Sequence, residues 1–271
     1  MNTLNNKIIY ILSIFIVLFT FSCQNNPEEK NEHATATEQK DTTHSTEQKD
    51  HWSYAGETGP EYWSKVIHGT QCDGSHQSPI DFSGEMLDKD FEALELDYKL
   101  DSILDIVNNG HTVQVNIPWG KFKFNGTEYN LVQFHFHAHS EHSLNGEFFP
   151  LEAHLVHVST DNKIAVIGIW YKEGKENPVL AKIYDQLPEK PGESVHSIIK
   201  IDLDNMLPID HSYYHYVGSL TTPPCTEGVE WFVMKHPREA SKEQIEKIRS
   251  LMPPNNYRPI QPKNNRIIED F

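Results

Sequence analysis

The chain has 271 residues, of which 37% are hydrophobic and 11% aromatic, enough for the core of one large domain or two small ones. Its 39 acidic and 23 basic residues give a formal net charge of −16. Such a charge argues against nucleic acid and anionic lipid surfaces as partners, and its ordinary role is to keep the protein soluble.

The first 23 residues have the pattern of a secretory signal peptide. A polar start with one lysine precedes the apolar run 8–21, which is too short to span a membrane comfortably. Cys23 stands where a lipoprotein signal places its lipidated cysteine, although Phe21 is bulky for that position. We expect a signal peptide of the lipoprotein type over residues 1–23. An ordinary cleaved signal with a free cysteine is the alternative.

Residues 24–50 have the composition of a polar tether. They contain no aromatic residue and no aliphatic residue larger than alanine. The sequence TEQKD occurs at 37–41 and again at 46–50, which we interpret as low complexity. A segment of this kind cannot bury apolar surface, so we predict that it is disordered and that His33 and His44 are solvated.

From His51 to Phe271 the pattern predicts one mostly β domain. Runs that alternate, or that are rich in β-branched and aromatic residues, indicate strands, and turn residues such as Asn109-Gly110 separate them. The predicted strands are Ile103–Asn108, Thr112–Ile117, Leu131–His137, Glu152–Ser159, Ile164–Tyr171, Tyr213–Leu220 and Glu230–Lys235. Two helices are predicted, Asn177–Gln186 and Ser241–Met252, the second with Ser241 as its N-cap.

Two histidines in the predicted strand 131–137 indicate a metal site. Alternation puts His135 and His137 on one face, with phenylalanines facing away. The next strand would add His154 if the two strands pair antiparallel. Three neutral imidazoles with an open fourth position are the arrangement of catalytic zinc. Spacing alone leaves two alternatives open: structural histidines, or chelation that includes His139, which has the same parity.

The run QFHFHAHSEHSLNGEFFPLEAHLVH, residues 133–157, resembles the signature of the alpha-class carbonic anhydrases. Other matching segments follow in family order over residues 51–262. They are GSHQSPID at 74–81, NNGHTVQV at 108–115, AVIGIWY at 165–171, GSLTTPPCTEGVEW at 218–231 and NNYRPIQP at 255–262. The chain departs from the family at Ala138-His139, a change that would alter the rim of the active site and spare the ligands.

The resemblance implies a fold and a reaction. The fold is mainly β, with a large twisted, mostly antiparallel central β-sheet and short peripheral helices. The reaction is the zinc-dependent, reversible hydration of carbon dioxide to bicarbonate and a proton, by attack of zinc hydroxide with a histidine as proton shuttle. A metal-free binding module on the same fold and a hydrolase for activated esters are the rival functions, and zinc content and ester turnover would discriminate them.

The resemblance also implies how the metal is held. Each of three histidines binds one zinc ion and gives its second ring nitrogen to a hydrogen-bond acceptor. The ligand and acceptor pairs are His135 with Gln133, His137 with the backbone carbonyl of Asn256, and His154 with Glu152. Alternation puts His157 on the opposite face from His154. His139 has the right parity but lies beyond the strand in the family pattern, so we expect neither histidine to be a ligand.

The resemblance assigns three catalytic residues. Thr221 matches the residue that accepts a hydrogen bond from the zinc-bound hydroxide, and Glu141 matches the carboxylate that takes the proton of Thr221. His111 matches the proton shuttle, a role that suits a side chain whose pKa lies near neutrality. Read alone, these three would be a turn threonine, a solvated charge and a loop histidine.

The remaining assignments concern the substrate and the cleft. Carbon dioxide is small and apolar, so it needs an apolar wall beside the metal. By the resemblance the wall consists of Val156, Val166, Leu220, Val229 and Trp231. Without the resemblance these would be read as ordinary core residues. Thr222 matches a residue that contacts bicarbonate, and Tyr54 and Asn109 match residues that order water in the cleft.

Cysteine use and partners complete the predictions. Many bacterial relatives bridge the positions of Cys72 and Cys225, so we expect a disulfide that contributes about 2–4 kcal/mol; two buried free thiols are the alternative. The expected partners are carbon dioxide and bicarbonate, with no nucleic acid. Membrane contact is expected only through a lipid on Cys23. The expected location of the protein is the periplasm or the cell surface. Whether two copies form a homodimer stays open.

Overall fold

The computed structural model describes residues 51–90 and 93–271. The predicted signal peptide and tether, including the predicted lipidation site Cys23, lie outside these residues. Within the described part, no helix has the length and hydropathy needed to cross a membrane.

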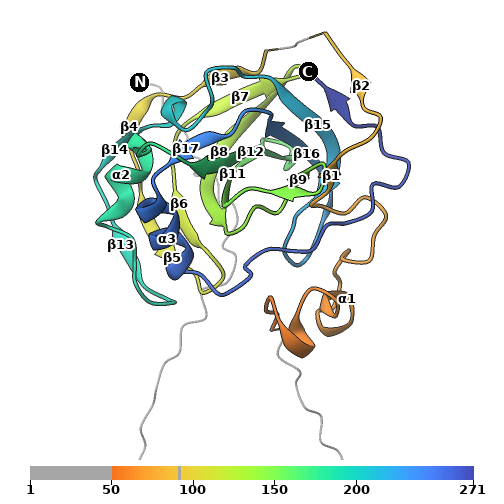
Figure 1. The fold of residues 1–271 in the computed structure, drawn as a ribbon, viewed down its shortest axis with the longest axis horizontal. Helices are drawn as coiled ribbons and strands as arrows, with labels where there is room; N and C mark the ends of the chain where they lie inside the picture. Colours follow the sequence, from red (N-terminus) through yellow and green to blue (C-terminus); the bar gives the residue numbers. More distant parts are fainter. Residues whose placement is uncertain (1–50, 91–92) are drawn as a thin grey trace, which may run out of the picture. The chain divides into compact units, whose positions relative to one another are not determined.

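Strands make up most of the regular structure (Figure 1). The helices are α1 Trp63–Val66, α2 Pro178–Tyr184 and α3 Lys242–Ser250, with short 3₁₀ turns η1 Gly56–Thr58 and η2 Leu203–Asn205. The strands are β1 Asp81–Phe82, β2 Leu87–Asp88, β3 Glu95–Asp97, β4 Leu100–Ser102, β5 Asp105–Asn108, β6 Val113–Asn116, β7 Lys121–Phe124, β8 Thr127–His137, β9 Ser143–Leu144, β10 Glu147–Phe148, β11 Leu151–Ser159, β12 Ile164–Glu173, β13 Ser194–His196, β14 Lys200–Asp202, β15 Tyr213–Ser219, β16 Glu227–Met234, β17 Arg238–Ala240 and β18 Glu269–Asp270.

One large sheet organises the described residues. Its order is β13-β5-β6-β8-β11-β12-β16-β15-β18-β2, and β3, β7 and β17 attach beside this path. Most neighbours are antiparallel; β12 pairs parallel with β16 and β17, and β18 pairs parallel with β2. The predicted fold, a mostly antiparallel central sheet with few short helices, is confirmed.

The sheet separates two apolar cores. Consecutive residues of one strand belong to different cores: Ile167 packs in the larger core and Val166 in the smaller one. The same division holds on β16 for Phe232 and Trp231. Because successive side chains of a strand point to opposite faces, the two cores lie on opposite sides of the sheet. The larger core also contains the buried faces of α2 and α3.

Local capping explains where the two longer helices begin. The side chain of Asn177 accepts hydrogen bonds from the backbone N–H groups of Val179 and Leu180 at the start of α2. Ser241 and Gln244 form a reciprocal capping box at the start of α3. Both predicted helices are confirmed, although each ends two residues earlier than predicted. The short helix α1 was not predicted.

A bulge divides β8 into two halves. Val156 of β11 lies opposite Gln133, whereas the next residue, His157, lies opposite Leu131, so Val132 has no counterpart. At the same place β8 changes its other neighbour, from β7 in the first half to β6 in the second. The extra residue lets Leu131 and Phe134 both face the larger core.

Candidate metal centre and active site

Three histidines from two neighbouring strands converge on the face of the smaller core. Strands β8 and β11 are antiparallel, and their register puts His154 opposite His135 and Glu152 opposite His137. The ring centroids of His135, His137 and His154 are 5.1, 5.4 and 4.6 Å apart in pairs. One possible ligand atom of each lies within 4.8 Å of the others, which suits a single small cation. The structure thus brings the predicted triad together.

Each of these histidines has one ring nitrogen held by an acceptor. His135 Nδ1 lies 2.8 Å from Gln133 Oε1, and His137 Nδ1 lies 2.6 Å from the backbone oxygen of Asn256. His154 Nε2 lies 3.0 Å from Glu152 Oε1. The second nitrogen of each ring therefore remains for a metal, as in other histidine-ligated sites.

The free nitrogens have the properties of metal ligands. His137 Nε2 is buried and has no hydrogen-bond partner within the described part of the chain. Burial lowers the pKa of His135 well below its usual value, helped by the neighbouring His137 and His154. Burial also lowers the pKa of His137, against the opposing charge of Glu141. Neutral imidazoles bind zinc, so the donor atoms fit that ion.

Glu152 accepts hydrogen bonds on both carboxylate oxygens. Its Oε1 faces His154 Nε2 and also His142 Nδ1, the latter at 2.8 Å. Its Oε2 accepts from the backbone N–H groups of Glu141 and His142 at 2.8 and 2.9 Å. Burial would raise the pKa of Glu152, but these neighbours lower it well below the usual value. The carboxylate stays charged and fixes the ring of His154.

Close packing behind Glu152 requires a glycine. Gly168 lies opposite His154 on β12. A Cβ at this position would lie 3.0 Å from Glu152 Oε1 and 3.2 Å from a methyl group of Val233. A larger residue here would therefore need a small shift of the Glu152 carboxylate or of Val233.

His142 is a member of this network that the sequence reasoning missed. Its Nε2 lies 2.7 Å from the hydroxyl of Tyr216, which in turn lies 2.8 Å from Ser78 Oγ. The residue is fully buried. His142 stands inside the run 133–157 that carries the family resemblance, but its position after β8 gave no alternation from which a role could be argued.

Glu141 lies against the metal-facing nitrogens. Its Oε1 accepts a hydrogen bond of 2.7 Å from the backbone N–H of Arg258. Its Oε2 lies 3.5 Å from His137 Nε2 and is a buried atom with no hydrogen-bond partner among the described residues. Thr221 is also buried, at 6% exposed. The predicted bond from Thr221 to Glu141 is not formed in this geometry, but an acceptor for it is available.

A closed loop carries Thr221 and Thr222. The backbone N–H of Leu220 donates to Thr226 O at 3.0 Å, and that of Cys225 donates to Thr222 O at 2.8 Å. Cys225 is joined to Cys72 by a disulfide of 2.04 Å, which confirms the predicted bridge. The loop is thus fixed at both its base and its tip.

The predicted apolar wall is assembled beside the histidines. All of its members belong to the smaller core or pack against it, where Val166, Val229 and Trp231 are buried and Val156 and Leu220 are partly buried. The rings of Trp231 and His154 are 4.8 Å apart. An apolar surface therefore adjoins the three histidines on the face where a small ligand would lie.

His111 stands in the turn between β5 and β6. The side-chain oxygen of Asn109 accepts hydrogen bonds of 2.9 Å from the backbone N–H groups of His111 and Thr112. The ring of His111 stacks on Trp52 with centroids 3.8 Å apart and planes 12° apart. Burial, and then the charge of His51, lowers the pKa of His111. The imidazole is therefore neutral near pH 7 and able to accept a proton.

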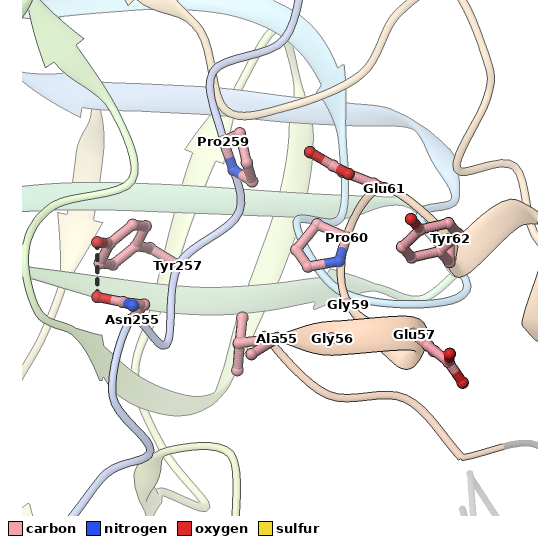
Figure 2. A pocket seen from close by; sticks show the side chains of 11 residues that line it. Ala55, Gly56, Glu57, Gly59, Pro60, Glu61, Tyr62, Asn255, Tyr257 and Pro259 are labelled. Carbon is pink, nitrogen blue, oxygen red and sulfur yellow. Dashed lines mark hydrogen bonds between the residues drawn. The ribbon is translucent and has the colours of Figure 1, made fainter.

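The two predicted water-ordering residues differ in exposure. Asn109 is exposed, and its side chain holds the His111 turn. Tyr54 is only 9% exposed, and burial together with the charge of Glu141 raises the pKa of its phenol. Tyr54 also lines a hollow of about 530 Å³ that is bounded by residues 54–62 and 255–259 (Figure 2). None of the three histidines lines this hollow.

His139 lies apart from the metal-facing nitrogens. Its Nδ1 donates to the backbone oxygen of Ser140 at 2.6 Å, and its ring stacks on Tyr257 with centroids 3.8 Å apart. Tyr257 in turn donates to Asn255 at 2.8 Å (Figure 2). His157, on the other face of β11, lies 2.6 Å from the hydroxyl of Tyr98. Neither histidine belongs to the group of three.

The sequence is similar to those of known carbonic anhydrases. The model of the eukaryotic-type carbonic anhydrase family matches residues 58–271. A carbonic anhydrase of Pectobacterium carotovorum is 40% identical over 221 residues, which cover 80% of this chain and 90% of the relative. A carbonic anhydrase of Nostoc sp. is 41% identical over 226 residues, with coverages of 80% and 84%.

Solved structures show the same likeness. The alpha-carbonic anhydrase of Thermovibrio ammonificans, in complex with the inhibitor sulfanilamide, is 43% identical with a TM-score of 0.78 and covers 81% of this chain and 98% of its own. Dioscorin, in complex with ascorbate, is 34% identical with a TM-score of 0.76, and the coverages are 82% and 98%.

Proposed function

Because the chain belongs to the alpha-carbonic anhydrase family, we propose that it hydrates carbon dioxide reversibly to bicarbonate and a proton, with zinc held by His135, His137 and His154. One observation carries the proposal: three buried or partly buried imidazoles each have one nitrogen held by an acceptor, and their other nitrogens converge. Zinc held by three neutral imidazoles supplies Lewis acidity, which makes hydroxide available from water near neutral pH.

The acceptors Gln133, Glu152 and the Asn256 carbonyl act by fixing tautomers. A ring nitrogen that donates to an acceptor leaves its lone pair on the other nitrogen, directed at the metal. The charged Glu152 binds this way to His154 and increases the basicity of that ring. These contacts support a site prearranged for the metal.

Thr221 and Glu141 would orient the attacking oxygen. Glu141 Oε2 has no hydrogen-bond partner among the described residues. As a carboxylate oxygen it can accept a hydrogen bond but cannot donate one. If the Thr221 hydroxyl donates its hydrogen bond to this oxygen, the hydroxyl oxygen can only accept a hydrogen bond from the nucleophile. The nucleophile then directs its lone pair at carbon dioxide held on the apolar wall, and Thr222 contacts the bicarbonate that forms.

His111 would remove the proton that each hydration releases. The ring is partly buried beside Trp52, at the end of a turn held by Asn109. A neutral imidazole at the mouth of the cleft can accept a proton through ordered water and pass it to buffer. The contribution of Tyr54 and Asn109 to that water order is part of this proposal.

The cellular site of the reaction follows from the N-terminal pattern and the disulfide. A structural disulfide is typical of proteins from oxidising compartments, and Cys72–Cys225 supports export. We place the enzyme in the periplasm or at the cell surface, with a lipid on Cys23 and residues 24–50 as a spacer.

Zinc analysis combined with stopped-flow hydration of carbon dioxide tests the proposal. The wild type should contain one zinc per chain and lose activity with a chelator, and His154→Ala should lose both zinc and activity. His139→Ala is the matched control, because His139 continues the sequence alternation of His135 and His137 but lies beyond the end of β8, with its ring against Tyr257. Full zinc occupancy in His154→Ala with loss in His139→Ala would contradict the assignment. A wild type without zinc would favour a metal-free binding module.

A further inference from the structure

An irregular segment after α3 reaches the centre of the site. Residues 253–259 form no helix or strand, yet Asn256 is fully buried and Arg258 is 3% exposed. The backbone oxygen of Asn256 accepts from His137 Nδ1, and the backbone N–H of Arg258 donates to Glu141 Oε1. A segment without ladder hydrogen bonds needs other contacts to hold these two groups in place.

The side chain of Arg258 supplies such contacts. Its Nη1 donates to Gln77 Oε1 at 2.7 Å and to the backbone oxygen of Ser78 at 2.9 Å, and its Nη2 donates to the backbone oxygen of Cys72 at 2.8 Å. The guanidinium also lies 5.6 Å from the centre of the Trp63 ring. Burial lowers the pKa of Arg258 to about 10, so it stays charged at neutral pH and these bonds are charge-assisted.

The same acceptors connect to the loop that carries Thr221. Gln77, held by Arg258 through Oε1, donates from Nε2 to the backbone oxygen of Cys225 at 3.2 Å. Cys72, held by Arg258 through its carbonyl, is bonded to Cys225 through sulfur. The guanidinium of Arg258 is therefore connected, through Gln77 and Cys72, to Cys225 in the loop that carries Thr221, while the backbone N–H of the same residue holds Glu141.

We propose that Arg258 is a positioning residue, whose guanidinium fixes the Glu141 carboxylate relative to the Thr221 hydroxyl. The inference rests on the proposed function, since it concerns how the nucleophile is oriented. Arg258 would touch neither substrate nor metal. Its planar fork binds three acceptors on three residues at once, two backbone oxygens and one side-chain oxygen, and a lysine cannot reproduce that geometry. Removal of the guanidinium should slow the hydration step, whose rate kcat/KM reports.

The test compares Arg258→Met and Arg258→Lys with the wild-type holoenzyme. We expect Arg258→Met to retain zinc and to lose about 10- to 100-fold in kcat/KM, because small displacements of an orienting group cost rates of this order. Turnover at saturation should fall less, since proton transfer through His111 is untouched. Arg258→Lys should recover part of the loss. Arg238→Met is the control, because Arg238 donates to Asn205 O away from the site and should leave kcat/KM unchanged.

A double-mutant cycle separates positioning from a merely structural role. In a Glu141→Gln background, Arg258→Met should lower kcat/KM by less than about threefold, because the group it positions is already impaired. Equal losses in both backgrounds would overturn the inference, as would a kcat/KM in Arg258→Met within about twofold of wild type. Loss of zinc from Arg258→Met would show that the substitution acts on the metal ligand His137, and this result would also overturn the inference.

Two further controls keep the result interpretable. If Arg258→Met fails to fold, the cycle with Arg258→Lys decides the question by the same criterion. A wild type that holds no zinc and hydrates no carbon dioxide would refute the proposed function itself. An active wild type, together with an Arg258→Met variant whose kcat/KM stays within about twofold of the wild-type value, would refute only the inference.

Discussion

Because the His157 side chain is buried, we predict that it lowers the folding stability of the protein in acid. The contribution of this one residue can be measured separately. Its ring is fully buried, with Nε2 2.6 Å from the hydroxyl of Tyr98 and its edge against Phe122. Burial lowers the pKa of His157 from 6.5 to about 3. Between these values the unfolded chain binds a proton that the folded protein excludes, so folding stability falls as pH falls.

The size of the effect follows from proton linkage. The contribution of neutral His157 is fully present above the unfolded pKa of 6.5 and is lost as pH falls toward about 3. From about pH 7.5 to about pH 4.5 the loss amounts to about 2.7 kcal/mol. The other buried histidines add their own losses, which are common to wild type and variant and cancel in the difference.

Urea unfolding at the two pH values, followed by tryptophan fluorescence, measures this difference. His157→Gln removes the titrating group and keeps a polar partner for Tyr98, so its free energy of unfolding should fall by about 2.7 kcal/mol less than that of the wild type. His68→Gln is the control, because His68 is exposed and should leave the pH dependence unchanged. If His157→Gln and wild type lose the same free energy within about 0.5 kcal/mol, the reasoning from burial is wrong.

Three further changes have distinct expected outcomes. His111→Ala should lower kcat and largely spare kcat/KM, and imidazole buffer should restore turnover; full kcat in a weak, bulky buffer would show that the proton leaves by another route. Replacing both Cys72 and Cys225 by serine should lower the free energy of unfolding by about 2–4 kcal/mol in urea, and an unchanged midpoint would contradict this. Cys23→Ser should move the protein out of the membrane fraction, and its full retention there would count against a lipid anchor.

The sequence predicted those parts of the site that depend on local pattern. Alternation put His135 and His137 on one strand face, and the structure has them there, opposite His154 and Glu152. The disulfide was predicted from the family resemblance and is present. The residues of the predicted apolar wall, named from the same resemblance, lie in or against the smaller core, and their role as a wall stays a prediction. The capped helices were predictable because Asn177 and Ser241 act within their own first turns.

Contacts that join distant segments could not be predicted. The chain of hydrogen bonds from Ser78 through Tyr216 to His142 uses three segments, and its two bonds join residues that are 138 and 74 positions apart. Arg258 meets Cys72 across 186 residues, and periodicity carries no information on such a pairing. The helix α1, at four residues, is too short to show a helical period.

The bulge at Val132 makes β8 modular. On an uninterrupted strand, any one-residue change of length would carry every later side chain to the opposite face. Here the interruption lies between the half that pairs with β7 and the half that pairs with β6 and bears the ligands. Changes of length in the first half can therefore be absorbed at the bulge during evolution without reorienting His135 and His137. Deletion of Val132 itself would leave a regular strand in which Leu131 and Phe134, then two residues apart, still face the larger core.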